Sequence, residues 1–110
     1  MNAEIETRDT ILHIVDKIKQ EYQPDKIILF GSYAYGQPDR DSDIDLLIIK
    51  DTQERFIDRL FNVTRIASDP RRLTPLEVIV LTPEELRERL QIGDQFLREA
   101  LTKGEVLYEI

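Results

Sequence analysis

Two aspartates separated by a single residue, Asp43 and Asp45, lie near the middle of the chain. Apolar residues follow them, so we expect both at the start of a strand, where residues i and i+2 project from the same face. Two carboxylates held side by side repel each other unless a cation lies between them. Hard oxygen ligands, without histidine or cysteine, select Mg²⁺ or Mn²⁺ over zinc. The pair therefore predicts a divalent-cation site.

A third acid is available from the next apolar run. Glu77 is the only acidic residue in the segment Leu76–Leu81. If this strand lies beside the strand of Asp45, Glu77 completes a cluster of three carboxylates. Such a cluster can hold two metal ions roughly 3.5–4 Å apart, which is the arrangement used for in-line displacement at phosphorus. We therefore expect Asp43, Asp45 and Glu77 to act as metal ligands and as catalytic residues.

A glycine–serine pair, Gly31 and Ser32, directly follows the apolar run Lys26–Phe30. A glycine lets the backbone approach a phosphate group closely. Ser32 is expected to cap a short helical turn over residues 33–35, whose amides would face an anion. Its hydroxyl can also donate to a phosphate oxygen. Phosphate donors and metal ligands at one end of a sheet are what nucleotidyl transfer requires.

The elements around these motifs predict a mixed α/β (α+β) fold, with a three- to four-stranded mixed sheet flanked by helices, in a single domain over residues 1–110. Helices are predicted by apolar residues at helical spacing, and strands by short runs rich in β-branched residues. The predicted helices cover residues 5–22, 52–68 and 84–90 and a segment from Asp94 to Gly104, and the predicted strands cover residues 26–30, 44–49, 76–81 and 106–108. Thr82 is expected to be the N-cap of a helix with Pro83 at its first position. On that helix we expect a solvated Glu85–Arg89 pair.

The composition limits the classes of function. The chain has 110 residues, and 15 Lys and Arg against 22 Asp and Glu give a net charge of −7. This acidity argues against autonomous nucleic-acid binding and suits a basic protein partner or a metal site. The absence of cysteine excludes disulfides and thiol nucleophiles. The polar first nine residues do not resemble a signal peptide, and no apolar run reaches membrane-spanning length. We expect a cytoplasmic protein without a membrane segment.

The string GSYAYGQPDRDSDIDLLI, which begins at Gly31, resembles the DNA polymerase beta-type nucleotidyltransferase superfamily, and in particular its small single-domain branch, the minimal nucleotidyltransferases (MNT). The later segments, a strand with a third acid, TPEEL and a Val-Leu-Tyr ending, are similar to that branch as well. The resemblance implies that Asp43 and Asp45 bind two Mg²⁺ ions and that Gly31 and Ser32 hold the nucleotide phosphates. The third acid of the family is commonly Asp, so Glu77 departs from the pattern by one methylene.

The resemblance also implies a partner and a reaction. Many MNT proteins are antitoxins encoded beside a small helical HEPN protein, with which they form a toxin–antitoxin pair. In characterised pairs the MNT protein transfers AMP from ATP to a tyrosine hydroxyl of the HEPN ribonuclease toxin. We therefore expect a Mg²⁺-dependent protein adenylyltransferase that uses ATP as its substrate.

Other interpretations remain open at this point. The chain could be a catalytically weak or inactive module that neutralises a HEPN partner by binding alone, which the departure at Glu77 favours. It could also transfer nucleotides to RNA or to a small hydroxylated antibiotic, the latter if an oligomer such as a dimer builds the missing pocket. Taken singly, the aspartates fit a solvated strand start and Gly31–Ser32 fits a plain turn. The single histidine, His13, is expected at the surface of the first helix.

Overall fold

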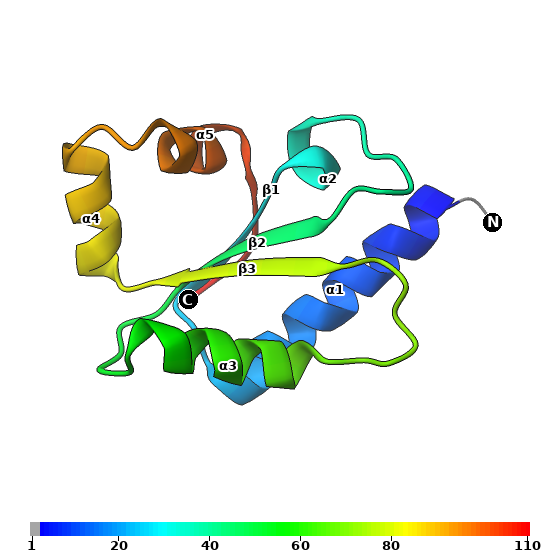
Figure 1. Cartoon of the computed structure of the whole chain (residues 1–110), viewed down its shortest axis with the longest axis horizontal. Coiled ribbons are helices and arrows are strands. Elements are labelled where there is room, and N and C mark those ends of the chain that lie inside the picture. The colour runs from blue at the N-terminus through cyan, green and yellow to red at the C-terminus, as the bar shows by residue number, and fades with distance from the viewer. Residues whose placement is uncertain (1–2) are drawn as a thin grey trace.

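A four-stranded sheet in the order β3-β2-β1-β4 forms the centre of the molecule, with helices against both of its faces (Figure 1). The structure is a computed structural model that describes residues 3–110, with side chains from residue 7 onward. Residues 1–2, part of the predicted domain span and of the polar N-terminus, lie outside the described residues. The strands are β1 (Lys26–Phe30), β2 (Ile44–Ile49), β3 (Leu76–Leu81) and β4 (Glu105–Glu109), and the helices are α1 (Ala3–Tyr22), α2 (Ser32–Tyr35), α3 (Phe56–Ala67), α4 (Pro83–Gln91) and α5 (Gln95–Lys103).

The strand pairing is mixed, as predicted. β1 is antiparallel to both β2 and β4, whereas β2 and β3 run parallel. In this register Phe30 of β1 pairs with Asp45 of β2, and Asp45 pairs with Glu77 of β3. Since paired residues on neighbouring strands project from the same face of a sheet, these three side chains form one row across three strands.

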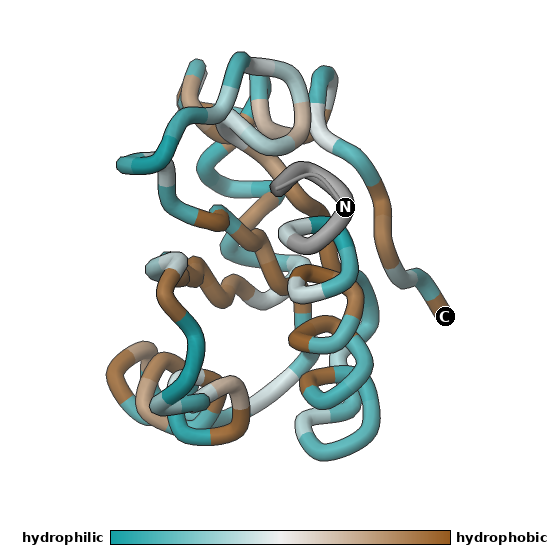
Figure 2. The backbone as a smooth tube through the Cα atoms, turned by 90° about the vertical axis from the view of Figure 1, so that its right-hand side faces the viewer, coloured by the Kyte–Doolittle hydropathy of each residue, from teal (hydrophilic) through white to brown (hydrophobic). Residues whose placement is uncertain are grey.

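Strand residues alternate between two hydrophobic clusters, one on each face of the sheet. One cluster packs against α1 and α3, and the other packs against α4 and α5. The strand members of the first are Ile27, Leu29, Ile44, Leu46, Ile48 and Val80, and those of the second are Ile28, Phe30, Leu47, Ile49 and Leu81. Figure 2 shows these hydrophobic strand segments between the helices. Because helices cover both faces of the sheet, the strands are continuous apolar runs in the sequence.

The longest helix, α1, has 20 residues and is amphipathic from residue 7 onward. Ile11, Ile14, Val15 and Ile18 are buried against the sheet, at the spacing that the sequence indicated, while His13 is exposed. Within residues 3–110, no helix has both the length and the apolar character needed to cross a membrane.

The predicted helix ends are confirmed for α4 and α5. Thr82 caps α4, its hydroxyl accepting from the amide of Glu85 while the Glu85 carboxylate accepts from the amide of Thr82. Asp94 caps α5 by accepting from the amide of Leu97 at 3.0 Å, and Gly104 is the C-cap. These bonds satisfy backbone groups that a helix end otherwise leaves without partners.

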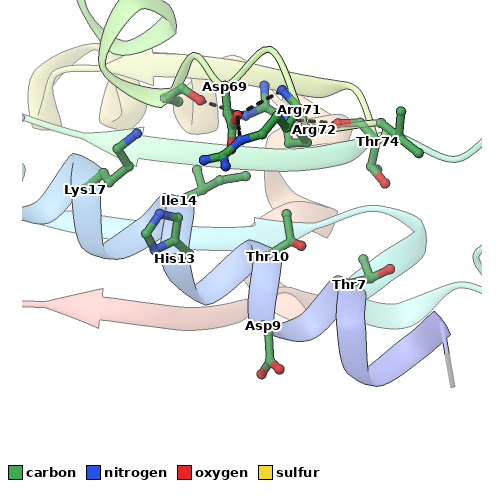
Figure 3. A pocket seen from close by; sticks show the side chains of 12 residues that line it. Thr7, Asp9, Thr10, His13, Ile14, Lys17, Asp69, Arg71, Arg72 and Thr74 are labelled. Atoms are coloured by element: carbon green, nitrogen blue, oxygen red, sulfur yellow. Dashed lines mark hydrogen bonds and ion pairs between the residues drawn. The ribbon is translucent and has the colours of Figure 1, made fainter. Parts of the chain in front are cut away.

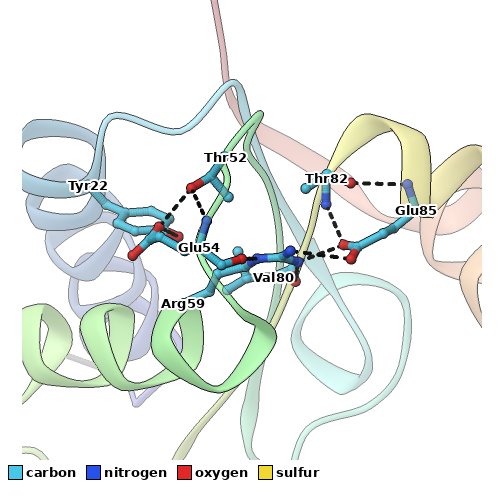
Figure 4. A network of polar contacts seen from close by, with 7 residues as sticks. All are labelled: Tyr22, Thr52, Glu54, Arg59, Val80, Thr82 and Glu85. Carbon is cyan, nitrogen blue, oxygen red and sulfur yellow. Dashed lines mark hydrogen bonds and ion pairs between the residues drawn. The ribbon is translucent and has the colours of Figure 1, made fainter.

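The predicted solvated pair between Glu85 and Arg89 is wrong. The Glu85 carboxylate turns toward the sheet and accepts a hydrogen bond from Arg59 Nη1 of α3 at 2.6 Å (Figure 4). Arg59 is buried, and its Nε donates to the carbonyl of Glu54 at 2.9 Å. A buried guanidinium needs a compensating charge more than a solvated arginine does, so Glu85 pairs across the fold rather than along its own helix. This network joins α3 to α4 at the end of β2 and β3 opposite to Asp45.

Candidate active site

The acids predicted to form the site meet at the start of the parallel strand pair. Asp45 lies in β2 directly beside Glu77 of β3, and Asp43 stands two residues before Asp45. Ile44, between the two aspartates, is fully buried in the cluster on the other face. The expectations that β3 lies beside β2 and that Ile44 turns away from the acids are therefore both confirmed.

The electrostatics of Asp45 reflect its acidic neighbours. Its partial burial, together with the negative charges of Glu77 and Asp43 and a hydrogen bond with Glu77, raises the pKa of Asp45 to about 6. Burial and like charges both disfavour the ionised form of a carboxyl group. Near neutral pH this corner of the sheet consequently holds mutually repelling carboxylates, an arrangement that favours a positively charged ligand.

The donor set fits a hard divalent cation, because Asp43, Asp45 and Glu77 offer only carboxylate oxygens. The arrangement of the three is less complete than the sequence suggested. The structure brings Asp45 and Glu77 together, but among its described residues no set of three or more His, Cys, Asp or Glu side chains is grouped so that it could hold a metal ion. The fit therefore rests on the chemistry of the donors and on the repulsion at Asp45.

The turn at Gly31 lies against Asp45. Gly31 has φ +75°, a conformation that costs other residues strain, and a Cβ at this position would collide with Asp45 Oδ2. Only a glycine allows the backbone to pass this close to the carboxylate. The phosphate-binding pair predicted from the sequence is thus brought to the predicted acids.

The predicted capping role of Ser32 is wrong. Gly31 is the N-cap of α2, Ser32 is the first helical residue, and no side chain caps the helix. The carbonyl of Gly31 accepts from the amides of Ala34 and Tyr35 at 3.0 and 3.1 Å. The positive φ of Gly31 turns the chain into the helix one residue earlier than expected. The Ser32 side chain is therefore not committed to capping α2.

Two hollows lie beside α1. Ser32 and Tyr33 line a small one of about 260 Å³ together with Arg8 of α1. A larger one of about 540 Å³ lies between α1 and the segment that leads into β3 (Figure 3). Basic side chains line it, among them Lys17 and Arg71, but none of the five predicted site residues does. The sequence did not indicate these groups, because they come from segments far apart in the chain and form no local motif.

The chain matches the family described as "Nucleotidyltransferase domain" over residues 11–106. A protein of Methanocaldococcus jannaschii, named "putative protein adenylyltransferase", is 35% identical over 103 residues, which cover 89% of this chain and 94% of the relative.

Two crystal structures share the fold. One is that of a "putative nucleotidyltransferase" from Sulfolobus solfataricus, with a TM-score of 0.66 and 20% identity over 96% of this chain and 83% of that one. The other is described as a toxin–antitoxin with AMP-PNP, with a TM-score of 0.64 and 23% identity over 90% of this chain and 73% of that one. At these low identities the two comparisons show a shared arrangement of helices and strands, which is the fold alone.

Proposed function

The chain belongs to the nucleotidyltransferase domain family, and we propose that it is a Mg²⁺-dependent protein adenylyltransferase that acts as the antitoxin of a HEPN toxin. The whole chain would be one minimal catalytic domain working in the cytoplasm. It would transfer AMP from ATP to a tyrosine hydroxyl of the toxin. The relative named as an adenylyltransferase supports the reaction, and the structural neighbour described as a toxin–antitoxin supports the class of partner.

The observation that carries the proposal is the contact between the Gly31 turn and the Asp45–Glu77 pair. The turn leaves no room for a Cβ beside Asp45, and Glu77 stands next to Asp45 on the neighbouring strand. A phosphate held by the turn would therefore lie directly beside the carboxylates. If the glycine–serine turn and the two acids lay at separate places in the fold, they could not act on the same phosphate group.

The residues divide the reaction among them. Gly31 and Ser32 would hold the triphosphate, and Asp43, Asp45 and Glu77 would hold Mg²⁺, which when bound would neutralise charge on the phosphates. Glu77 accepts the proton of the acceptor hydroxyl. The acceptor oxygen forms a bond to the α-phosphorus as the bond to the pyrophosphate oxygen breaks. Most of the rate enhancement comes from positioning and charge neutralisation, because the protein itself forms no covalent bond.

The type of group transferred is tested by the position of the label in ATP. The purified toxin encoded beside this chain is incubated with it and with Mg²⁺ and ATP labelled at either the α- or the γ-phosphate. Adenylylation transfers only the α-label, and mapping of the modified peptide identifies the acceptor side chain. Transfer of the γ-label instead would show a kinase and contradict the proposal.

The Gly31→Ala substitution tests the contact between the turn and Asp45. We expect transfer to fall at least about tenfold, because the new methyl group displaces the Asp45 carboxylate. The positive φ should also cost about 1–2 kcal/mol of unfolding free energy. Initial rates and urea denaturation measure the two effects. Gly93→Ala is the control, since Gly93 also has a positive φ but has no atom within 4 Å of the added Cβ. Equal activity losses in the two variants would remove the steric explanation.

Glu77 is tested by two substitutions that separate charge from length. Glu77→Gln should lower the rate roughly a hundredfold, because the amide cannot accept a proton in a general-base role. Glu77→Asp should retain transfer, because it keeps the carboxylate and restores the acid that is common in the family. Single-turnover rates at saturating ATP and Mg²⁺ measure both. An unchanged rate in Glu77→Gln would show that the third acid takes no part.

The alternative, neutralisation of the toxin by binding alone, is favoured by the incomplete grouping of the three acids within the described residues. It predicts a stable complex in which neither label is transferred and the Asp43→Asn variant still neutralises the toxin. Loss of neutralisation in that variant, with the complex intact, would exclude it.

A further inference from the structure

An aromatic side chain stands half exposed above the row of site residues. Phe96, in the first turn of α5, has 54% of its surface exposed. Its ring packs edge-to-face against the ring of Phe30, with 5.4 Å between the ring centroids and an interplanar angle of 88°. Phe30 itself is buried, with 6% exposed. Phe96 therefore packs on Phe30, at one end of the row, and still presents ring surface to solvent.

The location of Phe30 fixes Phe96 beside the site. Phe30 pairs with Asp45 across β1 and β2 and directly precedes Gly31 in the chain. The Cβ atoms of directly paired residues are about 5 Å apart, so Phe30 is an immediate neighbour of Asp45 as well as of Phe96. The exposed ring is thus one side chain away from the acids and from the glycine turn.

A second contact links α5 to the helix that follows the turn. Lys103, in the last turn of α5, lies over the ring of Tyr35 of α2 at 6.0 Å from its centroid. Helix α2 begins at Ser32, the predicted phosphate-binding serine. Contacts at both ends of α5, Phe96 on β1 and Lys103 on α2, therefore hold this helix against the elements that carry the site.

We propose that Phe96 is the platform on which the nucleobase of the substrate nucleotide stacks. The proposal rests on the proposed nucleotidyl transfer, because it is the nucleotide held at Gly31 and Asp45 whose base reaches α5. The ring of Phe96 offers an apolar surface without hydrogen-bonding groups, so it recognises a base by its π-face. Larger ring systems stack more strongly, so purine nucleoside triphosphates are preferred over pyrimidine ones.

The stacking role differs from a purely structural role in what Phe96→Leu changes. Leucine keeps an apolar contact with Phe30, and the neighbouring Leu97 still anchors α5 in the core, so the fold is preserved. The flat surface for a base is lost. A structural role predicts equal effects on every ligand, whereas stacking predicts an effect only on ligands that carry a base.

The test compares ATP with inorganic tripolyphosphate, which has the phosphates but no base. Binding of each is measured in the presence of Mg²⁺ for the wild-type protein and for Phe96→Leu. We expect the variant to bind ATP about tenfold more weakly, the size of one base–aromatic stack, and to bind tripolyphosphate as the wild type does. A 2-aminopurine nucleoside triphosphate should lose fluorescence on binding the wild type, as stacked 2-aminopurine does, and keep it with the variant.

The matched control is Phe56→Leu, since Phe56 is exposed to a similar degree, 49%, on α3 against the other face of the sheet. It should leave the affinities for both ligands unchanged. The stacking role would be overturned if the wild type and Phe96→Leu bound ATP equally well, or if the variant lost as much affinity for tripolyphosphate as for ATP. Transfer of the α-label would still support the proposed function in either case. Failure of the wild-type protein to bind either ligand would overturn both proposals.

Discussion

We expect the replacement of Asp45 by asparagine to abolish nucleotidyl transfer and to make the folded protein more stable above pH 6. The loss of activity, roughly a thousandfold or more, follows from removal of the negative charge that lies between the glycine turn and Glu77. The shape of the side chain is nearly unchanged, so the fold around it is preserved. An increase in stability on removal of a functional group is the expected mark of a site whose charges are held together against their repulsion.

The sign of the stability change follows from the pKa of Asp45, which is raised from 3.8 to about 6, first by burial and then by Glu77 and Asp43. A carboxyl group with a raised pKa destabilises the folded state once it ionises. The penalty is absent below pH 3.8, grows between pH 3.8 and about 6, and is complete above that. Because solvent screens this partly exposed group, we expect Asp45→Asn to gain about 1 kcal/mol at pH 8.

Urea denaturation of both proteins at pH 8 and pH 4, with EDTA present, measures this gain. It should be largest at pH 8 and should nearly vanish at pH 4. Mg²⁺ added at pH 8 should stabilise the wild type and have little effect on the variant, because a ligand stabilises only the state that binds it. An Asp45→Asn variant that is less stable than the wild type at pH 8 would contradict the assigned repulsion.

The largest loss of stability outside the hydrophobic core is expected for Glu85→Ala. This change leaves the buried Arg59 guanidinium without its ion-pair partner. It also removes the carboxylate that accepts from the amide of Thr82 in the α4 capping box. Removal of one member of a fully buried pair costs 3–5 kcal/mol, and the Glu85 side chain is 38% exposed, so we expect about 2 kcal/mol. For a chain of this length the melting temperature should fall by roughly 10 °C.

Thermal denaturation at pH 7 measures the loss, with Glu88→Ala on the exposed face of α4 as the control, which should change stability by less than about 0.5 kcal/mol. The hydrogen bond from Arg59 lowers the pKa of Glu85, so its stabilisation is present above the ordinary glutamate pKa of 4.5 and is lost as the pH falls through the lowered value. The wild type and Glu85→Ala should therefore converge in acid. The double variant Arg59→Met/Glu85→Leu should recover much of the loss.

The parts of the fold that the sequence predicted are those with a local physical cause. The spacing of Ile11, Ile14 and Ile18 indicated α1, the apolar runs indicated the strands, and Thr82 marked the start of α4 because capping involves neighbouring residues. The side-by-side placement of Asp45 and Glu77 was predicted only on the condition that β3 lies next to β2, which the parallel pairing satisfies.

The features that were missed depend on contacts between distant segments. Glu85 has an arginine four residues away on its own helix, yet it pairs with Arg59, 26 residues away, because only that arginine is buried. The edge-to-face contact of Phe96 with Phe30 also joins two segments that are far apart in the sequence. At Gly31 the error was local, since a glycine with positive φ displaced Ser32 from the capping position.

We expect this chain to add AMP to a partner protein through the carboxylates beside the Gly31 turn. The decisive measurement is intact mass spectrometry of the proposed toxin partner after incubation with this chain, ATP and Mg²⁺. The toxin should gain the mass of one AMP or a multiple of it, and this increase should be absent when Asp43→Asn replaces the wild-type chain. A toxin of unchanged mass in a stable complex with the wild-type chain would contradict it and leave neutralisation by binding alone.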